Sequence, residues 1–289
     1  MIYWKKLGQL FVPNTTNRHP KLLTHAANPL PIHLNKNVFR VFYSGRDEFN
    51  RSSVGAVDID ISTLRVVKIF DAPIFEHGIL NSFFADGISI GNVYEANGQR
   101  YMLFMGWQRP SNGHWRGDIG RFLVTPELNL IIDSPNPFMG SNSVDPISLS
   151  YPWVEKKASG GYDMWYGSTH TWDGGNGEMI HAIHHASSDD GHKWERHGIA
   201  VPFKLGVAQA FSRPTVAFNE DGSAEMWFSY RSGTGEKYRI GYAKRVNGTD
   251  WLLDLEGAGI SVSQDGWDSE MIEYPFVFDH NGKRYMMYN

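Results

Sequence analysis

The sequence predicts an all-β protein, a five-bladed β-propeller with a pocket in its central channel. The first observation is a repeat: five short runs end in aromatic residues that lie 61, 62, 62 and 60 residues apart. These aromatic anchors are Tyr43, Phe104, Tyr166, Phe228 and Tyr288. The second is that an apolar run opened by proline precedes four anchors, and a turn such as FNEDGS or DHNGK separates the two runs, as in a hairpin. An even period with several strands per repeat indicates a propeller.

Each repeat is expected to supply three or four strands in a fixed order. The innermost strands are expected where the chain leads into the proline runs, in THAANP, FFADGIS, SVDPISLSYP, AQAFSRP and DSEMIEYP. Second strands end at the anchors, and later strands follow in SVGAVDID, DIGRFLV, MIHAIHHASS and YRIGYAKR. The fifth repeat stops at Asn289, so we expect residues 2–12 to complete the last blade, the chain to be truncated there, or both. Residues 1–289 contain no linker, which predicts one domain.

Composition limits the classes of function. The net charge of −4, with mixed signs, argues against nucleic acid as the main partner, because phosphate binding needs a basic face. No stretch approaches the roughly 18 apolar residues of a spanning helix, and the N-terminus lacks the apolar core of a signal peptide. We therefore expect a cytoplasmic protein with no membrane partner, acting on a small molecule or an oligosaccharide. The sequence indicates no cofactor and leaves the oligomeric state open.

The innermost segments are unusually polar for strands in the middle of a fold. Their polar residues include His25, Asn28, Asp86, Asp145, Gln209, Ser212, Arg213, Asp268, Glu270 and Glu273. A buried charge is costly unless it is paired or functional. Because five repeats contribute polar residues to one end of the channel, we expect a functional site there.

Paired carboxylates suit glycosidic chemistry, in which one group protonates the leaving oxygen and the other activates water or attacks the sugar. We expect Glu270 to be the general acid and Asp86 or Asp145 to be the base or nucleophile. Arg213 and His25 would orient the substrate and tune the pKa values of these acids.

Further residues are expected to bind substrate. The ring of Trp107 offers a face on which a sugar can stack. The runs SGRDEFNRSS and FSYRSGTGEKYR are either solvated loops or a pocket rim that grips an anionic group through Arg46 and Arg231. Asp47, in the first of these runs, is also expected to bind substrate. Asn28, Asp268 and the residues named above complete the expected substrate-binding set.

Two other motifs are interpreted as structural. His181, His184 and His185 suggest a metal cluster by their number, but they lie on a predicted outer strand, and we expect no metal site there. Residues Ser187 to Trp194 match the S-x-D-x-G-x-x-W pattern of the Asp-box turn, in which the Ser and Asp side chains bond the backbone of a hairpin.

With these features together, the chain resembles the five-bladed glycoside hydrolase superfamily that includes families 43, 32, 68 and 130. It resembles more closely the bacterial glycosylase-like proteins often encoded among polysaccharide biosynthesis genes. The resemblance covers essentially the whole chain and is most specific in GWDSEMIEYPFVFDHNGKRYMMYN. It implies an Asp base or nucleophile in the first blade, a second Asp and a Glu acid, and Asp86, Asp145 and Glu270 are matched loosely to the acidic roles.

The first blade departs from this pattern, because HAANP carries His25 and Asn28 where family 43 hydrolases carry Asp. Three functions therefore stay open. The first is an enzyme that cleaves or transfers a glycosyl unit. The second is a phosphorylase or nucleotide-sugar enzyme that binds phosphate through Arg and His. The third is a non-catalytic sugar-binding propeller.

Overall fold

The computed structural model describes residues 2–13, 18–246 and 250–289. Over these residues the protein is all-β, as predicted, and its only helical segments are two short 3-10 turns, η1 (Pro20–Leu22) and η2 (Leu255–Ala258). No helix in the described ranges has the length and apolar character needed to cross a membrane.

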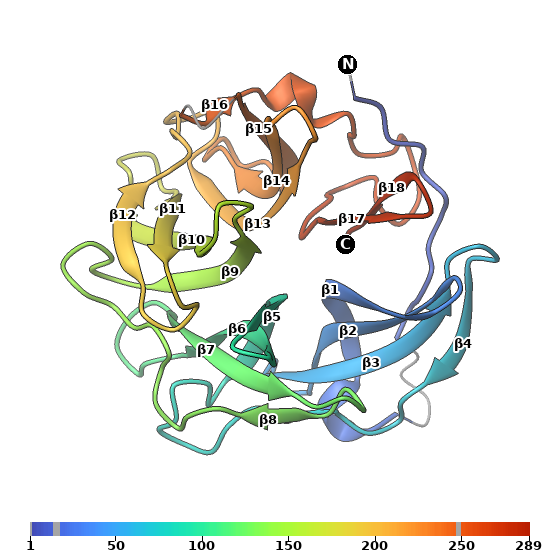
Figure 1. Ribbon diagram of the computed structural model, residues 1–289. Coiled ribbons are helices and arrows are strands. Elements are labelled where there is room, and N and C mark those ends of the chain that lie inside the picture. The colour runs from blue at the N-terminus through green and yellow to red at the C-terminus, as the bar shows by residue number, and fades with distance from the viewer. Residues whose placement is uncertain (1, 14–17, 247–249) are drawn as a thin grey trace.

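Two eight-stranded sheets and one hairpin make up the molecule, and Figure 1 shows them following one another around a ring. The first sheet contains β1 (Thr24–Asn35), β2 (Val38–Arg46), β3 (Ser52–Asp60), β4 (Arg65–Ile69), β5 (Gly87–Ala96), β6 (Gln99–Gln108), β7 (Arg116–Val124) and β8 (Leu130–Ile132). The second contains β9 (Leu149–Lys156), β10 (Tyr162–Thr171), β11 (Ile180–Ser188), β12 (Glu195–Ile199), β13 (Ala210–Phe218), β14 (Ala224–Arg231), β15 (Arg239–Arg245) and β16 (Leu252–Leu253). The hairpin is β17 (Phe276–His280) and β18 (Lys283–Met287).

Each large sheet consists of two four-stranded antiparallel meanders. The meanders are β1 to β4, β5 to β8, β9 to β12 and β13 to β16. A single parallel pair joins the two meanders of a sheet, Ser52 with Gly87 in the first and His181 with Ala210 in the second. The arrangement is that of a propeller, with the first strand of each meander nearest the centre of the ring (Figure 1).

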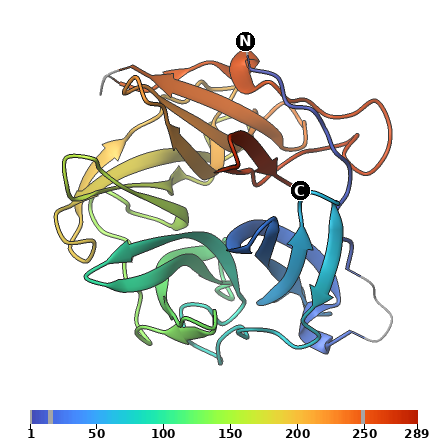
Figure 2. The same cartoon turned by 45° about the vertical axis from the view of Figure 1, so that its right-hand side comes forward.

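The last repeat differs from the expectation. The segment DSEMIEYP forms no strand, and residues 2–12, which we expected to complete a blade, form none either. The N-terminal segment nevertheless runs beside the end of the chain (Figure 2). The amide of Trp4 donates to the carbonyl of Gly259 (3.0 Å), and Lys6 pairs with Asp268 (2.7 Å). Side-chain and single backbone contacts therefore replace a full ladder here.

A β-bulge recurs in the innermost strands. The register of β1, β9 and β13 shifts at Asn28, Tyr151 and Arg213, whose φ angles are 56°, 39° and 49°. Tyr274, just before β17, has a φ of 55°. Each of these residues precedes a proline. Side chains other than glycine rarely adopt positive φ, so the same unfavourable conformation is held at four equivalent places.

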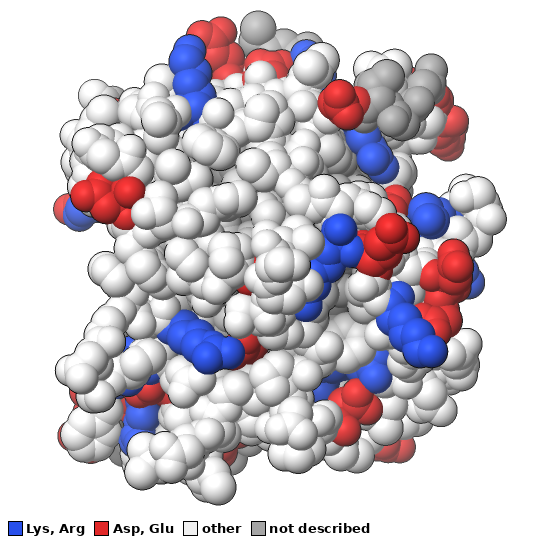
Figure 3. All heavy atoms as spheres, turned by 90° about the vertical axis from the view of Figure 1, so that its left-hand side faces the viewer, with Lys and Arg blue, Asp and Glu red and all other residues white. Residues whose placement is uncertain are grey.

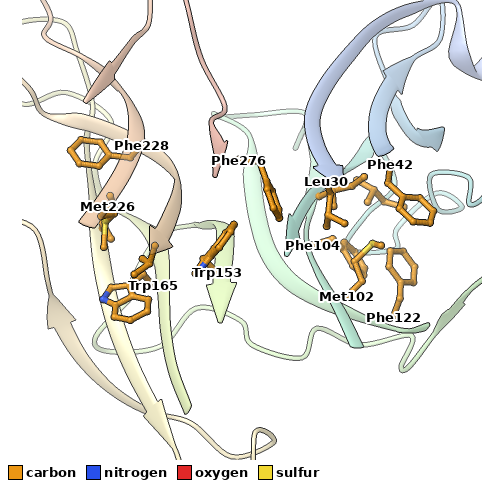
Figure 4. Close-up of a cluster of buried hydrophobic side chains, with 14 of the residues drawn as sticks. Leu30, Phe42, Met102, Phe104, Phe122, Trp153, Trp165, Met226, Phe228 and Phe276 are labelled. Atoms are coloured by element: carbon orange, nitrogen blue, oxygen red, sulfur yellow. The ribbon is translucent and has the colours of Figure 1, made fainter. Parts of the chain in front are cut away.

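The core lies between the sheets. The anchors Tyr43, Phe104, Tyr166 and Phe228 are all buried, which explains their regular spacing. Figure 4 shows residues of separate elements meeting near the ring centre, among them Trp153 of β9 and Phe276 of β17, whose ring centroids are 4.9 Å apart. Burial of aromatic rings between neighbouring meanders helps to hold them together.

Charged residues are dispersed over the outer surface. On the face in Figure 3, Lys and Arg side chains alternate with Asp and Glu, and uncharged residues separate them. This face carries no extended basic patch of the kind that binds a phosphate backbone.

Candidate functional site

A cavity of about 360 Å³ opens where the innermost strands begin. Both large sheets and the segment before β17 contribute to its wall. We refer to it as the inner-strand cavity, and it is lined by Arg46, Asn50, Ser89, Met105, Trp107, Arg109, Trp115, Ser150, Tyr151, Met179, His181, Ala210, Phe211, Ser212, Arg231, Tyr238 and Tyr274. Of the residues expected to bind substrate, the structure brings Arg46, Trp107 and Arg231 to this wall.

Aromatic rings form much of the wall. The hydroxyl of Tyr151 in β9 donates to that of Tyr274 just before β17 (3.2 Å), and both residues have a positive φ before a proline. Tyr238 packs against Tyr274 with ring centroids 6.2 Å apart. The indole Nε1 of Trp107 donates to Ser52 (3.0 Å), which fixes the orientation of its ring. Oriented aromatic faces in a cavity suit the apolar faces of sugar rings.

Three arginines line the cavity, and two of them hold carboxylates. Arg109 binds Asp86 (2.9 Å), and Arg231 binds Glu178 (2.9 Å). Asp86 precedes β5, as expected for an acid at the start of an innermost segment. Arg46 differs from the other two, because its Nη1 donates to the amide oxygen of Asn50 (2.7 Å).

Glu273 is an acid beside this cavity whose pKa is strongly raised. It is half-buried directly before Tyr274. Burial raises the pKa of Glu273 to about 7, although the charges of Arg46 and Arg231 and a hydrogen bond with Tyr274 act to lower it. A carboxyl group that is half protonated near neutral pH can donate a proton. The sequence placed Glu273 among the polar inner residues, but alternation along an expected strand did not separate it from Glu270.

Arg213 lies next to residues that line the cavity and contacts backbone. It is 2% exposed. Its guanidinium donates to the carbonyl of Pro29 (2.8 Å) and to that of Tyr274 (3.4 Å), so it links three separate elements. Burial lowers the pKa of Arg213 to about 9. No described carboxylate lies within ion-pair distance of it, so the expected contact with a catalytic acid is absent from the described residues.

Asp145 is fully buried away from the cavity wall. Its Oδ2 accepts hydrogen bonds from the hydroxyl of Tyr166 (2.8 Å) and from Arg196 (2.9 Å), and its Oδ1 lies 2.8 Å from Nδ1 of His184. Burial alone would raise the pKa of Asp145, but contacts with His184 and Tyr166 outweigh burial and bring it to about 2. Because its oxygens are already engaged by these side chains, Asp145 stabilises the fold at this position.

The described residues that line the cavity include no acid, and Glu270 and Asp268 lie off its wall like Asp86, Asp145 and Glu273. The side chain of Glu270 is 73% exposed and pairs with Lys237, which lowers the pKa of Glu270. Asp268 is buried between Lys6 and the hydroxyl of Tyr288.

Asp47 is likewise engaged within its own loop. It accepts from the backbone amides of Phe49 and Arg51 and pairs with the Arg51 side chain (2.8 Å). A short local turn explains why this acid follows the hairpin of the first repeat.

His25 and Asn28 lie at the start of β1, outside the cavity wall. His25 is exposed and its Nδ1 lies 2.9 Å from the Thr24 hydroxyl. Although the residue is largely exposed, partial desolvation of its ring, followed by the charge of Arg46, lowers the pKa of His25. Asn28 is buried, and its backbone amide donates to the side-chain oxygen of Asn289 (3.0 Å).

His181 is a lining residue that sequence reasoning treated as part of an outer strand. Its ring nitrogens contact Ser150 (2.6 Å) and Thr169 (2.7 Å). Burial, followed by the charges of His184 and His170, lowers the pKa of His181 to about 3. Within the described ranges, no group of three or more His, Cys, Asp or Glu residues could hold a metal ion.

The predicted Asp-box turn is present one residue further along. The hydroxyl of Ser188 accepts from the amide of Gly191 (2.9 Å), and Asp190 accepts from the amides of His192 and Lys193 (2.8 Å each). Ser188 and Asp190, in place of the Ser187 and Asp189 of the pattern, therefore form the turn.

Comparison with known proteins identifies close sequence relatives. The chain is 37% identical over 288 residues to the uncharacterized protein Rv1502 of Mycobacterium tuberculosis strain H37Rv, covering 99% of this chain and 94% of that one. The uncharacterized protein MT1551 of strain CDC 1551 is similar to the same extent. No protein-family model matches the chain.

Solved structures of glycoside hydrolases share the fold. An endo-arabinase from Bacteroides thetaiotaomicron has a TM-score of 0.62 at 13% identity, covering 96% of this chain and 92% of that one. A glycosyl hydrolase from Bacteroides ovatus has a TM-score of 0.68 at 12% identity, covering 99% and 89%. A member of the GH130 family, which contains glycoside hydrolases that target β-1,2 mannosidic linkages in Candida mannan, has a TM-score of 0.67 at 11% identity, covering 96% and 90%.

Proposed function

The chain belongs to one family with the uncharacterized Mycobacterium tuberculosis protein Rv1502, and we propose that it is a carbohydrate-active enzyme that cleaves or transfers a glycosyl unit in the inner-strand cavity. The fold shared with glycoside hydrolases supports this proposal. In this proposal the four meanders and the terminal hairpin are five propeller blades, and the cavity is the central pocket. A cytoplasmic role in polysaccharide biosynthesis is a further part of it and rests on the sequence resemblance.

We assign the role of general acid to Glu273, because its raised pKa is the main observation that supports the proposal. Burial brings the pKa of Glu273 to about 7 beside a cavity walled by aromatic rings. A protonated Glu273 would transfer its proton to the leaving oxygen as the glycosidic bond breaks. The hydrogen bond between Tyr151 and Tyr274 holds the neighbouring wall in place.

The second carboxylate of the mechanism is proposed to be Asp86 or Glu178. Each is bound by an arginine that lines the cavity, Arg109 and Arg231 respectively. As a carboxylate, either residue could activate a water molecule or attack the sugar carbon. Asp145 is assigned a structural role instead, because Tyr166 and Arg196 already occupy its Oδ2.

The test is the substitution Glu273→Gln, assayed on a panel of aryl glycosides and oligosaccharides. We expect kcat/KM to fall by about 10²–10⁴-fold, the range that general acid catalysis contributes. Thermal unfolding of the variant should stay cooperative, because glutamine keeps the size of the side chain.

Glu270→Gln separates the two possible acids, since Glu270 lies only three residues earlier on the surface. If this variant loses turnover while Glu273→Gln keeps it, the acid is Glu270 and our assignment is overturned. If the wild type binds sugars but turns over none of the panel, the protein is a sugar-binding propeller.

A further inference from the structure

The charges around the inner-strand cavity do not balance. Asp86 and Glu178 pair with two of the three lining arginines, Arg109 and Arg231. For Arg46, no described carboxylate lies within ion-pair distance, and its polar contact is the neutral amide of Asn50. Glu273 is near enough for the charge of Arg46 to lower its pKa, but burial holds that pKa at about 7, so Glu273 is half neutral at physiological pH.

A second positive charge lies next to residues that line the cavity. Arg213 is buried, and its guanidinium is bonded to neutral backbone carbonyls. A cation in a buried environment is costly unless a negative charge compensates it. Arg46 and Arg213 therefore make this part of the molecule attractive to an anion.

Unused hydrogen-bond donors occur at the same place. Among buried side-chain atoms of the described residues, Oγ of Ser212, Nε of Arg231 and Nε of Arg213 have no hydrogen-bond partner. Ser212 and Arg231 both line the cavity. Buried donors are almost always satisfied, so unpaired donors that line a cavity indicate a place for an acceptor.

We infer that the inner-strand cavity binds an anionic group, a phosphate or a carboxylate, with Arg46 and Arg231 as its charged ligands and Ser212 as a hydroxyl donor. The group belongs either to the sugar substrate itself or to inorganic phosphate that acts as a second substrate. The inference rests on the proposed function for the sugar part of the ligand, and on the charge distribution alone for the anion.

Binding of an anion would also act on the proposed acid. The charge of Arg46 is one of the influences that lower the pKa of Glu273. An anion on Arg46 would offset that charge and favour the protonated form of Glu273. Binding of an anionic substrate would therefore favour the protonated form of Glu273, which is the form that donates the proton.

The test is isothermal titration of the protein with inorganic phosphate, glucose 1-phosphate, glucose 6-phosphate, glucuronate and neutral glucose at fixed ionic strength. We expect at least one anion to bind more tightly than glucose, and Arg46→Gln to weaken that binding by about tenfold or more, because a charge-assisted hydrogen bond is lost. Arg100→Gln is the matched control, since Arg100 pairs with Glu95 on the surface.

Two results would overturn the inference. One is that no anion of the panel binds better than glucose. The other is that Arg46→Gln and Arg100→Gln bind the anion equally well.

The source of the anion follows from which ligand binds best. A sugar phosphate or a uronate that binds more tightly than inorganic phosphate places the anion on the sugar. Inorganic phosphate that binds well and increases the rate of glycoside cleavage is a second substrate.

Titration of Glu273→Gln separates this inference from the proposed function. The variant keeps Arg46 and should bind the anion whether or not Glu273 is the acid. Anion binding that depends on Arg46, together with full turnover by Glu273→Gln, would retain this inference and reject the assigned acid.

Discussion

Glu270 and Glu273 show how far local environment separates two identical side chains. Glu270 is exposed and pairs with Lys237, which lowers the pKa of Glu270. Burial raises the pKa of Glu273 to about 7. Only the raised pKa of Glu273 suits proton donation near neutral pH, although the two residues are just three positions apart in the sequence.

The pKa of Glu273 predicts how activity depends on pH. The acid must be protonated to react, so kcat/KM should fall as the pH rises through about 7. Arg46→Gln removes a charge that lowers this pKa, so the alkaline limb should move to higher pH in that variant. A pH–rate profile of both proteins checks this prediction. A limb that stays at the same pH in the variant would contradict the coupling of Arg46 to the acid.

The same group gives a stability signature that needs no substrate. The pKa of Glu273 is raised on folding, so its contribution to the free energy of unfolding is present below its ordinary pKa and is lost as the pH rises through about 7. This part of the pH dependence of unfolding should be absent from Glu273→Gln, because glutamine does not titrate.

At the scale of elements, the recurring positive-φ residue before a proline directs side chains from several repeats toward the cavity. Tyr151, Arg213 and Tyr274 each adopt positive φ before a proline. Tyr151 and Tyr274 meet at the cavity wall, and the guanidinium of Arg213 reaches the carbonyl of Pro29. Regular strands would alternate their side chains between two faces and would not direct these residues to one place.

Arg213→Lys tests the role of the guanidinium in this element. Its planar fork reaches the carbonyls of Pro29 and Tyr274 together, whereas a single ammonium cannot take both directions. We expect the free energy of unfolding to fall by about 1–3 kcal/mol, the cost of leaving a buried acceptor unsatisfied. Urea unfolding measures it, with Arg100→Lys as an exposed control. Equal midpoints for the two variants would show that stability does not depend on the fork.

At the scale of the whole molecule, closure of the ring depends on a few contacts at the end of the described chain. The amide and carbonyl of Asn289 pair with the backbone of Glu273 (2.8 and 2.6 Å). The side chain of Asn289 donates to the carbonyl of Ala26 (2.7 Å) and accepts from the backbone amide of Asn28 (3.0 Å). Asn289 therefore joins the last repeat to the first.

Asn289→Ala should loosen this junction. The amide of the buried Asn28 loses its acceptor, which costs about 1–3 kcal/mol. Urea unfolding should show that loss, and hydrogen exchange should show reduced protection at Asn28. Asn112→Ala, at an exposed position, serves as the control. Unchanged protection at Asn28 would mean that the ring is held closed by other contacts, such as that between Lys6 and Asp268.

The sequence by itself determined the all-β class and the repeat, because aromatic anchors at an even spacing must be buried in equivalent places. It also named Arg46, Trp107 and Arg231 as candidate substrate-binding residues, and all three line the cavity, where each ends or nearly ends a second strand. These features depend on local periodicity and turn chemistry, which a sequence carries directly.

Only the tertiary structure decided which acids are paired and which are buried near the cavity. Asp145, in a loop, is engaged by Arg196 of β12, and Glu270 by Lys237 from a distant segment. Glu273 owes its raised pKa to burial among residues brought from several repeats. Pairing and burial of a carboxylate arise from contacts between segments far apart in the chain, and neither periodicity nor spacing specifies those contacts.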